Sequence, residues 1–477
     1  MKSGARFWIG LSLMAVTSAC AGSKLPDEPD SYVAAEAIGA ERAAELAASP
    51  AATWLDDLNS AEMSALVREA LAGSPDLQRA EATANASRWR ARGAFGRWLP
   101  DASVGADGTR TETPVPGTNP TQRTRTEIMT SSVLASWEVD IWGRVGAGVM
   151  AADLTADAAR ADLDAARLSV AGQTARGWVD VIEAQQLLAL AREDLQTRER
   201  ALDLTQRRYE AGIVSSLNLR TARSQVASAR AFEAQAGEAL LGASRRLQEV
   251  MGRYPDGLLT AEGELPQLAP IAAAGAPGDL LERRPDVLAA ERRMRAAGFR
   301  IHEARTALLP RLTLRASAGS SGQGLTDIDD SVNMVSNLVA GITMPIFQGG
   351  ALISEARASV NDRRAAASGY VSTAIGAWSE VEGAISSDQS LQVRETQFAI
   401  AADEAREAQA LAEREYARGV ATLFELIDAY TRRIDAERGL ITARAARVSN
   451  RISYHVALGG GARTGGIDPA RSEDQAQ

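Results

Sequence analysis

The chain has little of the side chains that carry most enzyme chemistry. Of its 477 residues only Cys20 is a cysteine, and only His302 and His455 are histidines. A lone cysteine cannot form an internal disulfide, and two histidines so far apart in the sequence make no metal-binding motif. No phosphate-binding loop or nucleophile motif is present either. The composition argues against an enzyme, and both histidines are expected to be packing or groove residues.

The chain also lacks an excess of basic residues. Lysine and arginine number 52 against 61 acidic residues, for a formal net charge of −9. A general nucleic-acid binder presents a basic surface, so we expect no nucleic-acid partner. Aromatic residues make up only 5% of the chain, whereas alanine is abundant in 151–166 and 399–412. Such small, strongly helix-forming side chains favour closely packed helices.

Proline is missing from two long stretches, one between Pro120 and Pro255 and one between Pro345 and Pro469. Because proline breaks a helix interior, each stretch can hold very long helices. A glycine turn divides each stretch once. The sequence therefore predicts two helical hairpins, each preceded by a short helix. The predicted helices are 75–98, 144–211 and 216–251 in the first half, and 285–308, 350–417 and 422–458 in the second.

The two halves of the chain repeat each other. Pro75 recurs as Pro285, 210 residues further on, and Gly212 recurs as Gly419 after 207 residues. Other prolines and glycines recur at the same two offsets. Constant offsets over several landmarks indicate an internal duplication, and not chance similarity among alanine-rich helices.

The lengths of the helices point to an assembly. At 1.5 Å per residue the helix 144–211 spans about 100 Å, and the two shorter helices of its half nearly add up to this length. We therefore expect two short helices, stacked end to end, beside each long one. Much of the burial must come from other subunits, because such a helix exceeds a compact domain's diameter. Seven-residue spacings predict coiled-coil seams at Val181, Leu188, Leu195, Leu202 and Tyr209, and at Ile427, Ile434, Ile441, Val448 and His455.

Between the short and the long helix of each half the pattern changes to that of strands. Residues 131–141 and 311–318 alternate apolar with polar side chains, and 102–112 and 332–346 are weaker strand candidates. Each half thus predicts one β-hairpin. Four strands cannot close a barrel, and a membrane does not tolerate open sheet edges, so several copies would have to share one barrel. A soluble hairpin packed on the helices is the alternative.

The N-terminus reads as an export signal. Lys2 and Arg6 precede an apolar segment, residues 7–16, that is too short to span a bilayer as a mature helix. Cys20 follows at the end of this segment. The segment resembles a bacterial lipoprotein signal, in which the cysteine is acylated and becomes the first residue, although Thr17 stands where an aliphatic residue is usual. A chance cysteine beside an ordinary cleavage site is the alternative.

Together these elements resemble the TolC/OprM family of outer-membrane efflux proteins, specifically its lipoprotein (NodT-like) branch. The segments that carry the resemblance are 136–144, 281–287, 344–350 and 416–428. The resemblance implies a mainly α fold with a small β part. In this fold, duplicated long-helix hairpins form a trimeric α-barrel, and four strands per protomer contribute to a twelve-stranded outer-membrane β-barrel.

The resemblance also implies partners and a division of the chain. Family members pass small molecules from an inner-membrane pump, usually of the resistance-nodulation-division class, through a periplasmic adaptor. The expected function is therefore a passive, homotrimeric exit duct, anchored in the outer membrane by the lipid on Cys20 and without a cofactor. The division is a signal peptide at 1–19, a lipidated segment with part of an equatorial belt at 20–60, the first repeat at 61–252, an equatorial linker at 253–278, the second repeat at 279–459 and a flexible tail at 460–477.

The resemblance places a periplasmic gate early in the last long helix, at Glu425 and Asp428. The two acids are three residues apart and share one helical face. Three copies would gather six carboxylates in a narrow mouth. The first repeat has Asn218 and Thr221 at the matching positions, so it lacks both acids. Two acids on a solvated helix face are the alternative.

The two turns are the tips that relatives present to the adaptor. They comprise Gly212, Ile213, Val214, Ser215 and Ser216 in the first hairpin, and Gly419, Val420, Ala421, Thr422 and Leu423 in the second. Ile213, Val214, Val420 and Leu423 are expected to be exposed. Some relatives have an arginine at the position of Ala421 that helps to lock the closed state. The turns could instead only cap the hairpins.

Two other functions stay open at this point. One is the exit duct of a type I protein-secretion system, which the lipoprotein signal disfavours. The other is a coiled-coil envelope tether without a pore. Ion conductance by the purified protein would exclude the tether.

Overall fold

The structure is a computed structural model. It describes Trp54, Leu55, Leu58, Ile271 and residues 60–117, 123–268, 283–322 and 334–460. The chain divides into two compact units, Met1–Ala47 and Ala48–Gln477, and every described residue belongs to the second. The predicted signal peptide, Cys20, most of the 20–60 segment and the tail after Gly460 lie outside the described residues. No described helix has a stretch long and apolar enough to cross a membrane.

The six predicted helices are confirmed, each within two residues of its predicted bounds. They are α4 (Pro75–Gly96), α5 (Arg144–Glu210) and α6 (Ser216–Met251) in the first repeat, and α8 (Pro285–Thr306), α9 (Ala351–Arg418) and α10 (Leu423–Ala457) in the second. Helix α3 (Ala61–Gly73) was not predicted. Its N-cap is Ser60, whose hydroxyl accepts a hydrogen bond from the backbone N–H of Met63.

Local chemistry explains these boundaries. Pro75 and Pro285 stand in the first turn of α4 and α8, where a missing N–H breaks no helical hydrogen bond. Gly252 ends α6 at a φ of 75°. A Cβ at this position would lie 2.6 Å from the carbonyl oxygen of Gly73, so close packing against α3 also requires glycine here.

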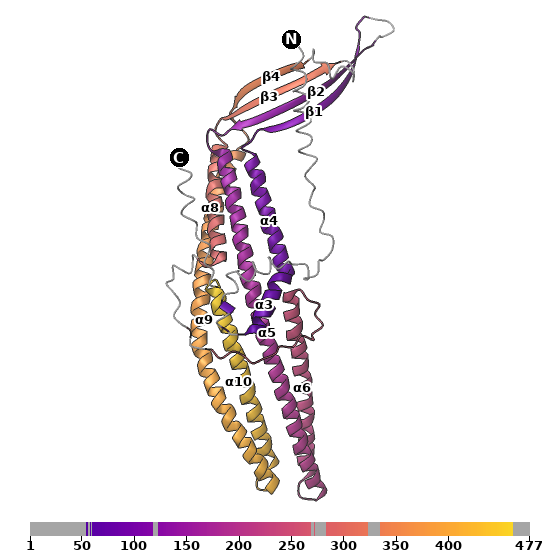
Figure 1. Ribbon diagram of the computed structural model, residues 1–477, viewed down its shortest axis with the longest axis vertical. Coiled ribbons are helices and arrows are strands. Elements are labelled where there is room, and N and C mark those ends of the chain that lie inside the picture. The colour runs from indigo at the N-terminus through magenta and orange to yellow at the C-terminus, as the bar shows by residue number, and fades with distance from the viewer. Residues whose placement is uncertain are drawn as a thin grey trace. The chain divides into compact units, whose positions relative to one another are not determined.

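The two repeats have the same helix arrangement (Figure 1). Helices α4 and α6 both pack on α5, and α8 and α10 both pack on α9. The predicted pairing of one long helix with two shorter ones is therefore confirmed. Helix α5 also packs against α8 and α10, so it joins the two repeats.

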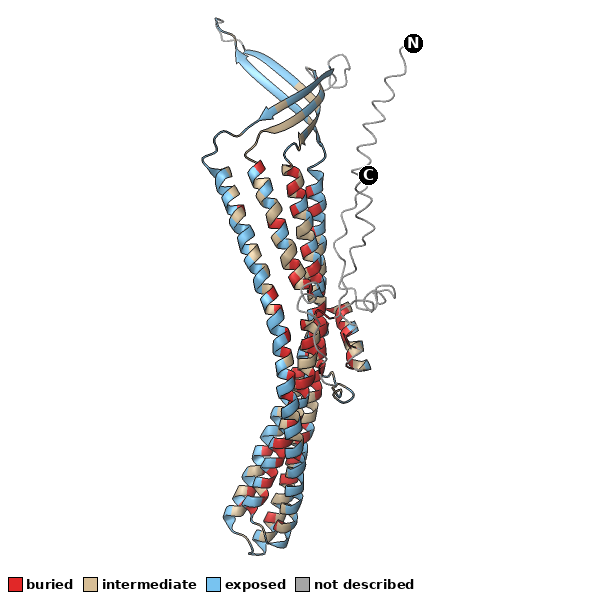
Figure 2. Ribbon diagram, turned by 90° about the vertical axis from the view of Figure 1, so that its left-hand side faces the viewer, coloured by how far each residue is buried: buried red, intermediate tan, exposed pale blue. Residues whose placement is uncertain are grey.

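Burial differs strongly between the two long helices (Figure 2). The middle of α5 holds the core, where Trp178 and Val179 are at most 1% exposed. Helix α9 leaves Val371, Ile375 and Val393 52–62% exposed. Apolar side chains exposed along a long helix indicate an interaction surface.

The predicted seams are confirmed in part. Val181, Leu188, Ile434 and Val448 are buried. Tyr209 is 41% exposed, so the seam prediction is wrong there. It lies in the last turn of α5, where the hairpin ends and fewer neighbours remain. At the other end of the seams, His455 stacks on Trp54 with 5.7 Å between ring centroids, which confirms a packing role.

The four predicted strands are confirmed and form one antiparallel sheet in the order β1-β2-β3-β4. They are β1 (Asp101–Pro114), β2 (Arg123–Val139), β3 (Arg311–Gly322) and β4 (Met334–Thr343). Each repeat contributes one hairpin, and the pairing of β2 with β3 joins the two. Among the described residues, β1 and β4 are paired on one side only.

The register places alternate residues on two faces of the sheet. We call one the apolar face; its large side chains are Val104, Met129, Val133, Trp137, Val139, Leu312, Leu314, Met334, Leu338 and Ile342. The opposite, polar face carries five charged residues, many serines and threonines, and four large apolar residues. The charged residues are Asp101, Asp107, Glu138, Arg311 and Arg315, and the apolar ones are Ile128, Leu134, Val335 and Val339. Such an alternation is typical of a sheet with lipid on one side and water on the other.

Candidate functional site

The tip of the first hairpin is a glycine turn between α5 and α6. Gly212 adopts a φ of 72°, and the N–H of Ile213 donates to the carbonyl of Arg208 at 2.9 Å, which closes the end of α5. Ser215 is the N-cap residue of α6. Ile213 is 67% exposed, as predicted. Val214 is half-buried, so its predicted exposure is only partly confirmed.

The tip of the second hairpin has the same design. Gly419 adopts a φ of 81°, and the N–H of Val420 donates to the carbonyl of Glu415 at 3.0 Å. Val420 is 75% exposed, as predicted. The prediction that Leu423 is exposed is wrong, because the side chain is 2% exposed. It is the first residue of α10 and turns inward into a cluster between the hairpins.

A capping box organises the start of α10. The carboxylate of Glu425 accepts hydrogen bonds from the backbone N–H of Thr422 at 2.6 Å and from its hydroxyl at 2.9 Å. In return, the backbone N–H of Glu425 donates to the Thr422 hydroxyl at 3.3 Å. The backbone hydrogen bond first, and then the hydroxyl, hold the pKa of Glu425 below its usual value of 4.5. Glu425 is therefore ionised at neutral pH.

Asp428 lies one turn further along α10 and is exposed like Glu425. Its carboxylate forms an ion pair with the guanidinium of Arg432 at 2.7 Å, and the two side chains are 61% and 72% exposed. The structure thus places both predicted gate acids on the surface at the tip of the second hairpin. One of them is also a helix cap, a role that the gate prediction did not include.

The two hairpins are joined near their tips by a cluster of α6, α9 and α10 residues. Its buried members are Ala222, Tyr416, Leu423, Leu426 and Tyr430. The hydroxyl of Tyr416 lies 2.9 Å from that of Thr205 on α5, where both residues are at most 2% exposed. Thr205 already donates to the carbonyl of Ala201, so Tyr416 is the donor in this contact. The guanidinium of Arg208 covers the Tyr416 ring at 4.8 Å.

No local sequence pattern predicts this contact, because Thr205 and Tyr416 are 211 residues apart and belong to different repeats. Two exposed apolar residues beside the turns, Leu217 (61%) and Phe424 (59%), were not predicted either. The repeat contained a signal for the second pair. Phe424 stands 207 residues after Leu217, the same offset that relates the two turn glycines.

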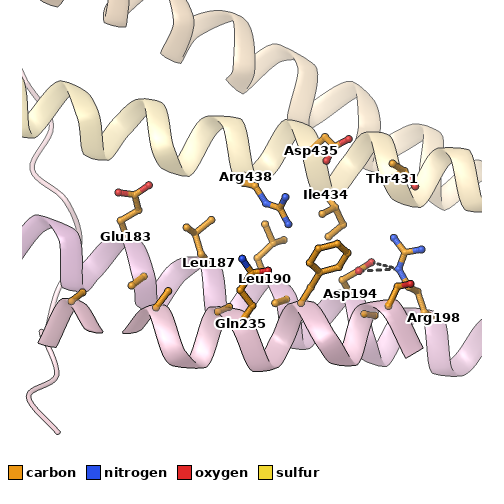
Figure 3. A pocket seen from close by; sticks show the side chains of 18 of the residues that line it. Glu183, Leu187, Leu190, Asp194, Arg198, Gln235, Thr431, Ile434, Asp435 and Arg438 are labelled. Carbon is orange, nitrogen blue, oxygen red and sulfur yellow. Dashed lines mark hydrogen bonds and ion pairs between the residues drawn. The ribbon is translucent and has the colours of Figure 1, made fainter. Parts of the chain in front are cut away.

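A groove with a volume of about 870 Å³ lies along α5 between α6 and α10 (Figure 3). Asp194 and Arg198 lie in its wall, joined by hydrogen bonds of 3.0 and 2.8 Å, and Arg198 also bonds Gln225 of α6. Both members of this ion pair belong to α5, and the pair holds the Arg198 guanidinium where it can bond Gln225. Of these bonds, the one between Arg198 and Gln225 joins α5 to α6. Among the described residues, no group of histidine, cysteine or acidic side chains is arranged to hold a metal ion.

Comparison with known proteins decides the family. A profile of the outer membrane efflux protein family matches residues 66–253 and again residues 276–460. The chain belongs to the outer membrane efflux protein family. The two matched stretches begin 210 residues apart and end 207 residues apart, which are the offsets of the internal repeat. The family profile thus matches each half of the duplication inferred from the sequence.

Individual relatives of this efflux protein match over most of their length. Outer membrane protein OprJ of Pseudomonas aeruginosa is 29% identical over 465 residues, which cover 95% of this chain and 96% of the relative. The pyoverdine export outer membrane protein OpmQ of Pseudomonas putida is 27% identical over 426 residues, which cover 88% and 90%. A solved membrane protein from Pseudomonas aeruginosa is 27% identical, with a TM-score of 0.79 and coverage of 85% of this chain and 95% of that one.

Proposed function

We propose that this efflux family protein is a homotrimeric exit duct that conducts small molecules passively through the outer membrane. The molecules arrive from an inner-membrane pump of the resistance-nodulation-division class through a periplasmic adaptor. The observation that carries the proposal is the four-stranded sheet, with its apolar face and its one-sided pairing at β1 and β4. Within a membrane such edges need partners, and further copies of the chain would supply them.

The exposed side of α9 supports the same assembly. Val371, Ile375 and Trp378 follow one another at helical spacing and are 52%, 57% and 38% exposed. The long helix therefore presents an exposed apolar stripe, which is the pattern of a helix that a neighbouring subunit covers. Three copies with four strands each would supply twelve strands to one barrel.

Glu425 and Asp428 are proposed to line the narrow periplasmic mouth of this duct. Gathered carboxylates attract cations and repel anions, so they should make the open mouth cation-selective. The contact between Tyr416 and Thr205 would hold the second hairpin against the first and so restrain opening. Ala421 is not charged, so a lock in this chain would have to come from other residues, and this buried contact is the candidate.

The tips are proposed to dock the adaptor through matched apolar residues. Ile213 and Leu217 of the first hairpin correspond to Val420 and Phe424 of the second, and all four are 59–75% exposed. Exposed apolar side chains at the end of a hairpin suit a protein partner. The double variant Ile213→Asp/Val420→Asp should lose efflux in cells, whereas Tyr254→Asp, which changes an exposed residue away from the tips, should retain it.

Lipid attachment at Cys20 is proposed as the anchor of the N-terminus. An acyl group adds membrane affinity to the protein through its buried methylene groups. Metabolic labelling with a clickable fatty acid should mark the wild-type protein. A Cys20→Ala variant that still takes up the label would contradict the proposal.

The gate can be tested by changing charge without changing the cap. Glutamine can replace glutamate in a capping box, so Glu425→Gln removes the charge and keeps the start of α10. In planar bilayers, the variant Glu425→Gln/Asp428→Asn should have a lower cation-to-anion permeability ratio, measured as the reversal potential in a salt gradient. Protein that conducts no ions at all would contradict the duct itself.

The matched control is Asp203→Asn on α5. Asp203 pairs with Arg207 at 2.7 Å with side chains 60% and 74% exposed, nearly the same geometry as Asp428 with Arg432. We expect this control to leave the permeability ratio unchanged. If the control lowers the permeability ratio as much as the gate variant does, Glu425 and Asp428 do not line a constriction that selects cations.

A further inference from the structure

The charged residues of the sheet fall into two groups. Five lie on the polar face, as described above. The other five, Arg110, Glu112, Arg123, Arg125 and Glu127, all lie on the apolar face. We call these five residues the charge ladder. Cross-strand pairing places Arg110 opposite Glu127 and Glu112 opposite Arg125, so the five side chains form successive rungs on one side of the β1–β2 hairpin.

The charge ladder begins where the apolar band ends. Between Trp137 and Met129 of β2, the apolar face holds no charged residue on any of the four strands, and its only polar side chains there are serines. The pairing of β2 with the described part of β3 ends at Met129 and Gly322. Beyond this pair, β1 and β2 continue as a two-stranded hairpin that carries the ladder (Figure 1).

The part of the apolar face between Trp137 and the ladder matches a bilayer in height, and a further apolar row, Val139, Leu312 and Ile342, lies beyond Trp137. Ten residues separate Trp137 from Glu127, which is about 33 Å along the strand at about 3.3 Å per residue. At a strand tilt of about 40° this corresponds to a height of about 25 Å, the usual apolar height of an outer-membrane sheet. Trp137 then lies at one interface, where aromatic residues concentrate, and the ladder begins at the other.

Charge on a lipid-facing surface is tolerated only near the interface. The ladder therefore belongs at the level of the lipid headgroups, which occupy about 5–7 Å on each side of the hydrocarbon. Its three arginines exceed its two glutamates by one positive charge. Within each strand a glutamate holds an arginine side chain: Arg110 lies 2.9 Å from Glu112 on β1, and Arg125 bonds Glu127 on β2. The arginine side chains stay 51–69% exposed.

We propose that the charge ladder binds the phosphate group of a lipid in the distal leaflet, while the apolar face below it contacts the acyl chains. Guanidinium groups pair with phosphate through parallel hydrogen bonds, and they do so better than ammonium groups. A phosphate-bearing lipid fits both parts of the surface, whereas free phosphate fits only one. The proposal rests on the proposed function, in which the sheet lies in the outer membrane.

The test is native mass spectrometry of the detergent-purified protein, titrated with phosphatidic acid or with phosphatidylcholine of the same acyl composition. The wild type should retain phosphatidic acid preferentially. The variant Arg110→Gln/Arg123→Gln/Arg125→Gln should lose this preference, by about fivefold for each arginine removed. Inorganic phosphate, added at the concentration of the lipid, should not displace the bound phosphatidic acid.

The control is Arg315→Gln, which removes the same charge from the polar face of the same sheet. It should leave the preference intact. Wild-type protein without a preference, a triple variant that keeps it, displacement by inorganic phosphate, or an equal loss in the control would each overturn the proposal. If the triple variant does not assemble, Arg123→Gln serves instead, because it leaves the Arg110–Glu112 and Arg125–Glu127 pairs in place.

Conductance separates this inference from the proposed function. A protein that conducts ions and has no preference for phosphatidic acid is a duct without the headgroup site. A protein that does not conduct contradicts the duct, whatever lipid it binds.

Discussion

Removing one hydroxyl group should loosen the contact between the two hairpins. The substitution is Tyr416→Phe. It deletes the donor of the 2.9 Å hydrogen bond to Thr205, while the ring stays in place beneath Arg208. Thr205 keeps its own hydrogen bond to Ala201, so the variant leaves no unpaired donor on α5. The change is therefore confined to one contact between two repeats.

The size of the effect follows from burial and symmetry. A buried hydrogen bond between neutral groups contributes about 1 kcal/mol net, since its partners would otherwise bond to water. One contact would thus shift the balance between closed and open tips about fivefold. In a trimer whose three tips open together, the loss would be about 3 kcal/mol, a shift of roughly 150-fold.

The assay is the open fraction of single channels in planar bilayers without an adaptor. Tyr416→Phe should raise it by between about fivefold, for independent tips, and roughly 150-fold, for tips that open together. In a double-mutant cycle, Thr205→Val should add little to the opening of Tyr416→Phe, because both remove the same hydrogen bond.

Tyr430→Phe is the matched control. Tyr430 is a buried tyrosine of the same cluster, and its hydroxyl bonds Glu413 of α9, so this contact stays within one hairpin. Burial is the first cause that raises the pKa of Tyr430, followed by the charge of Glu413. The control should lower stability without changing the open fraction. An unchanged open fraction in Tyr416→Phe, or an equal rise in the control, would refute the reasoning.

Three further predictions concern the tips and the joint of the second repeat. Gly419→Ala and Gly212→Ala should each cost about 1 kcal/mol of stability, since both glycines have a left-handed backbone conformation. Only Gly419→Ala should also displace Arg208, because its guanidinium lies 3.1 Å from the added Cβ. Chemical shifts at Arg208 would reveal this displacement. The pKa of Glu425 in the folded protein lies below its usual value of 4.5, so its ionised form contributes stability above pH 4.5 that is lost as the pH falls through the folded pKa. Over that pH range, hydrogen exchange at the start of α10 should become faster in the wild type and should not change in Glu425→Gln. Arg284→Met should lower the free energy of unfolding by about 2 kcal/mol, measured by circular dichroism in urea, because it removes hydrogen bonds of a charged group. Arg284 is 8% exposed and bonds Glu380 of α9 and the carbonyl of Ala457 at the end of α10, and Arg284→Lys should recover part of the loss.

Much of the fold followed from short-range patterns. Pro75 and Pro285 each begin a helix, and Gly212 and Gly419 each follow the end of one. These signals are local, because the backbone conformations of proline and glycine depend little on distant neighbours. The alternation of apolar and polar residues likewise identified β2 and β3, whereas β1 and β4 were weaker candidates that the structure confirms. Helix α3 escaped prediction because its one clear signal, the serine cap, is common outside helices too.

The candidate site was predictable only in part. The positions of Glu425 and Asp428 near the second turn came from the resemblance, and the structure places both on the surface there. The resemblance did not predict that Leu423 turns inward, because the direction of a side chain at the start of a helix depends on how the helix is rotated against its neighbours. The capping role of Glu425 has a local signal, because a threonine followed three residues later by a glutamate is the pattern of a capping box.

The sequence by itself determined the repeat, the helix bounds, the presence of the strands and the family, since each depends on residues close together or on a constant offset. The strand bounds were less certain, because β2 begins at Arg123, eight residues before its predicted start. Only the tertiary structure decided which side chains meet across the repeats. Thr205 and Tyr416 touch because two helices lie at one particular rotation and height, and helical periodicity sets neither. The charge ladder became visible for the same kind of reason, since strand register places Arg110, Arg125 and Glu127 on a single face.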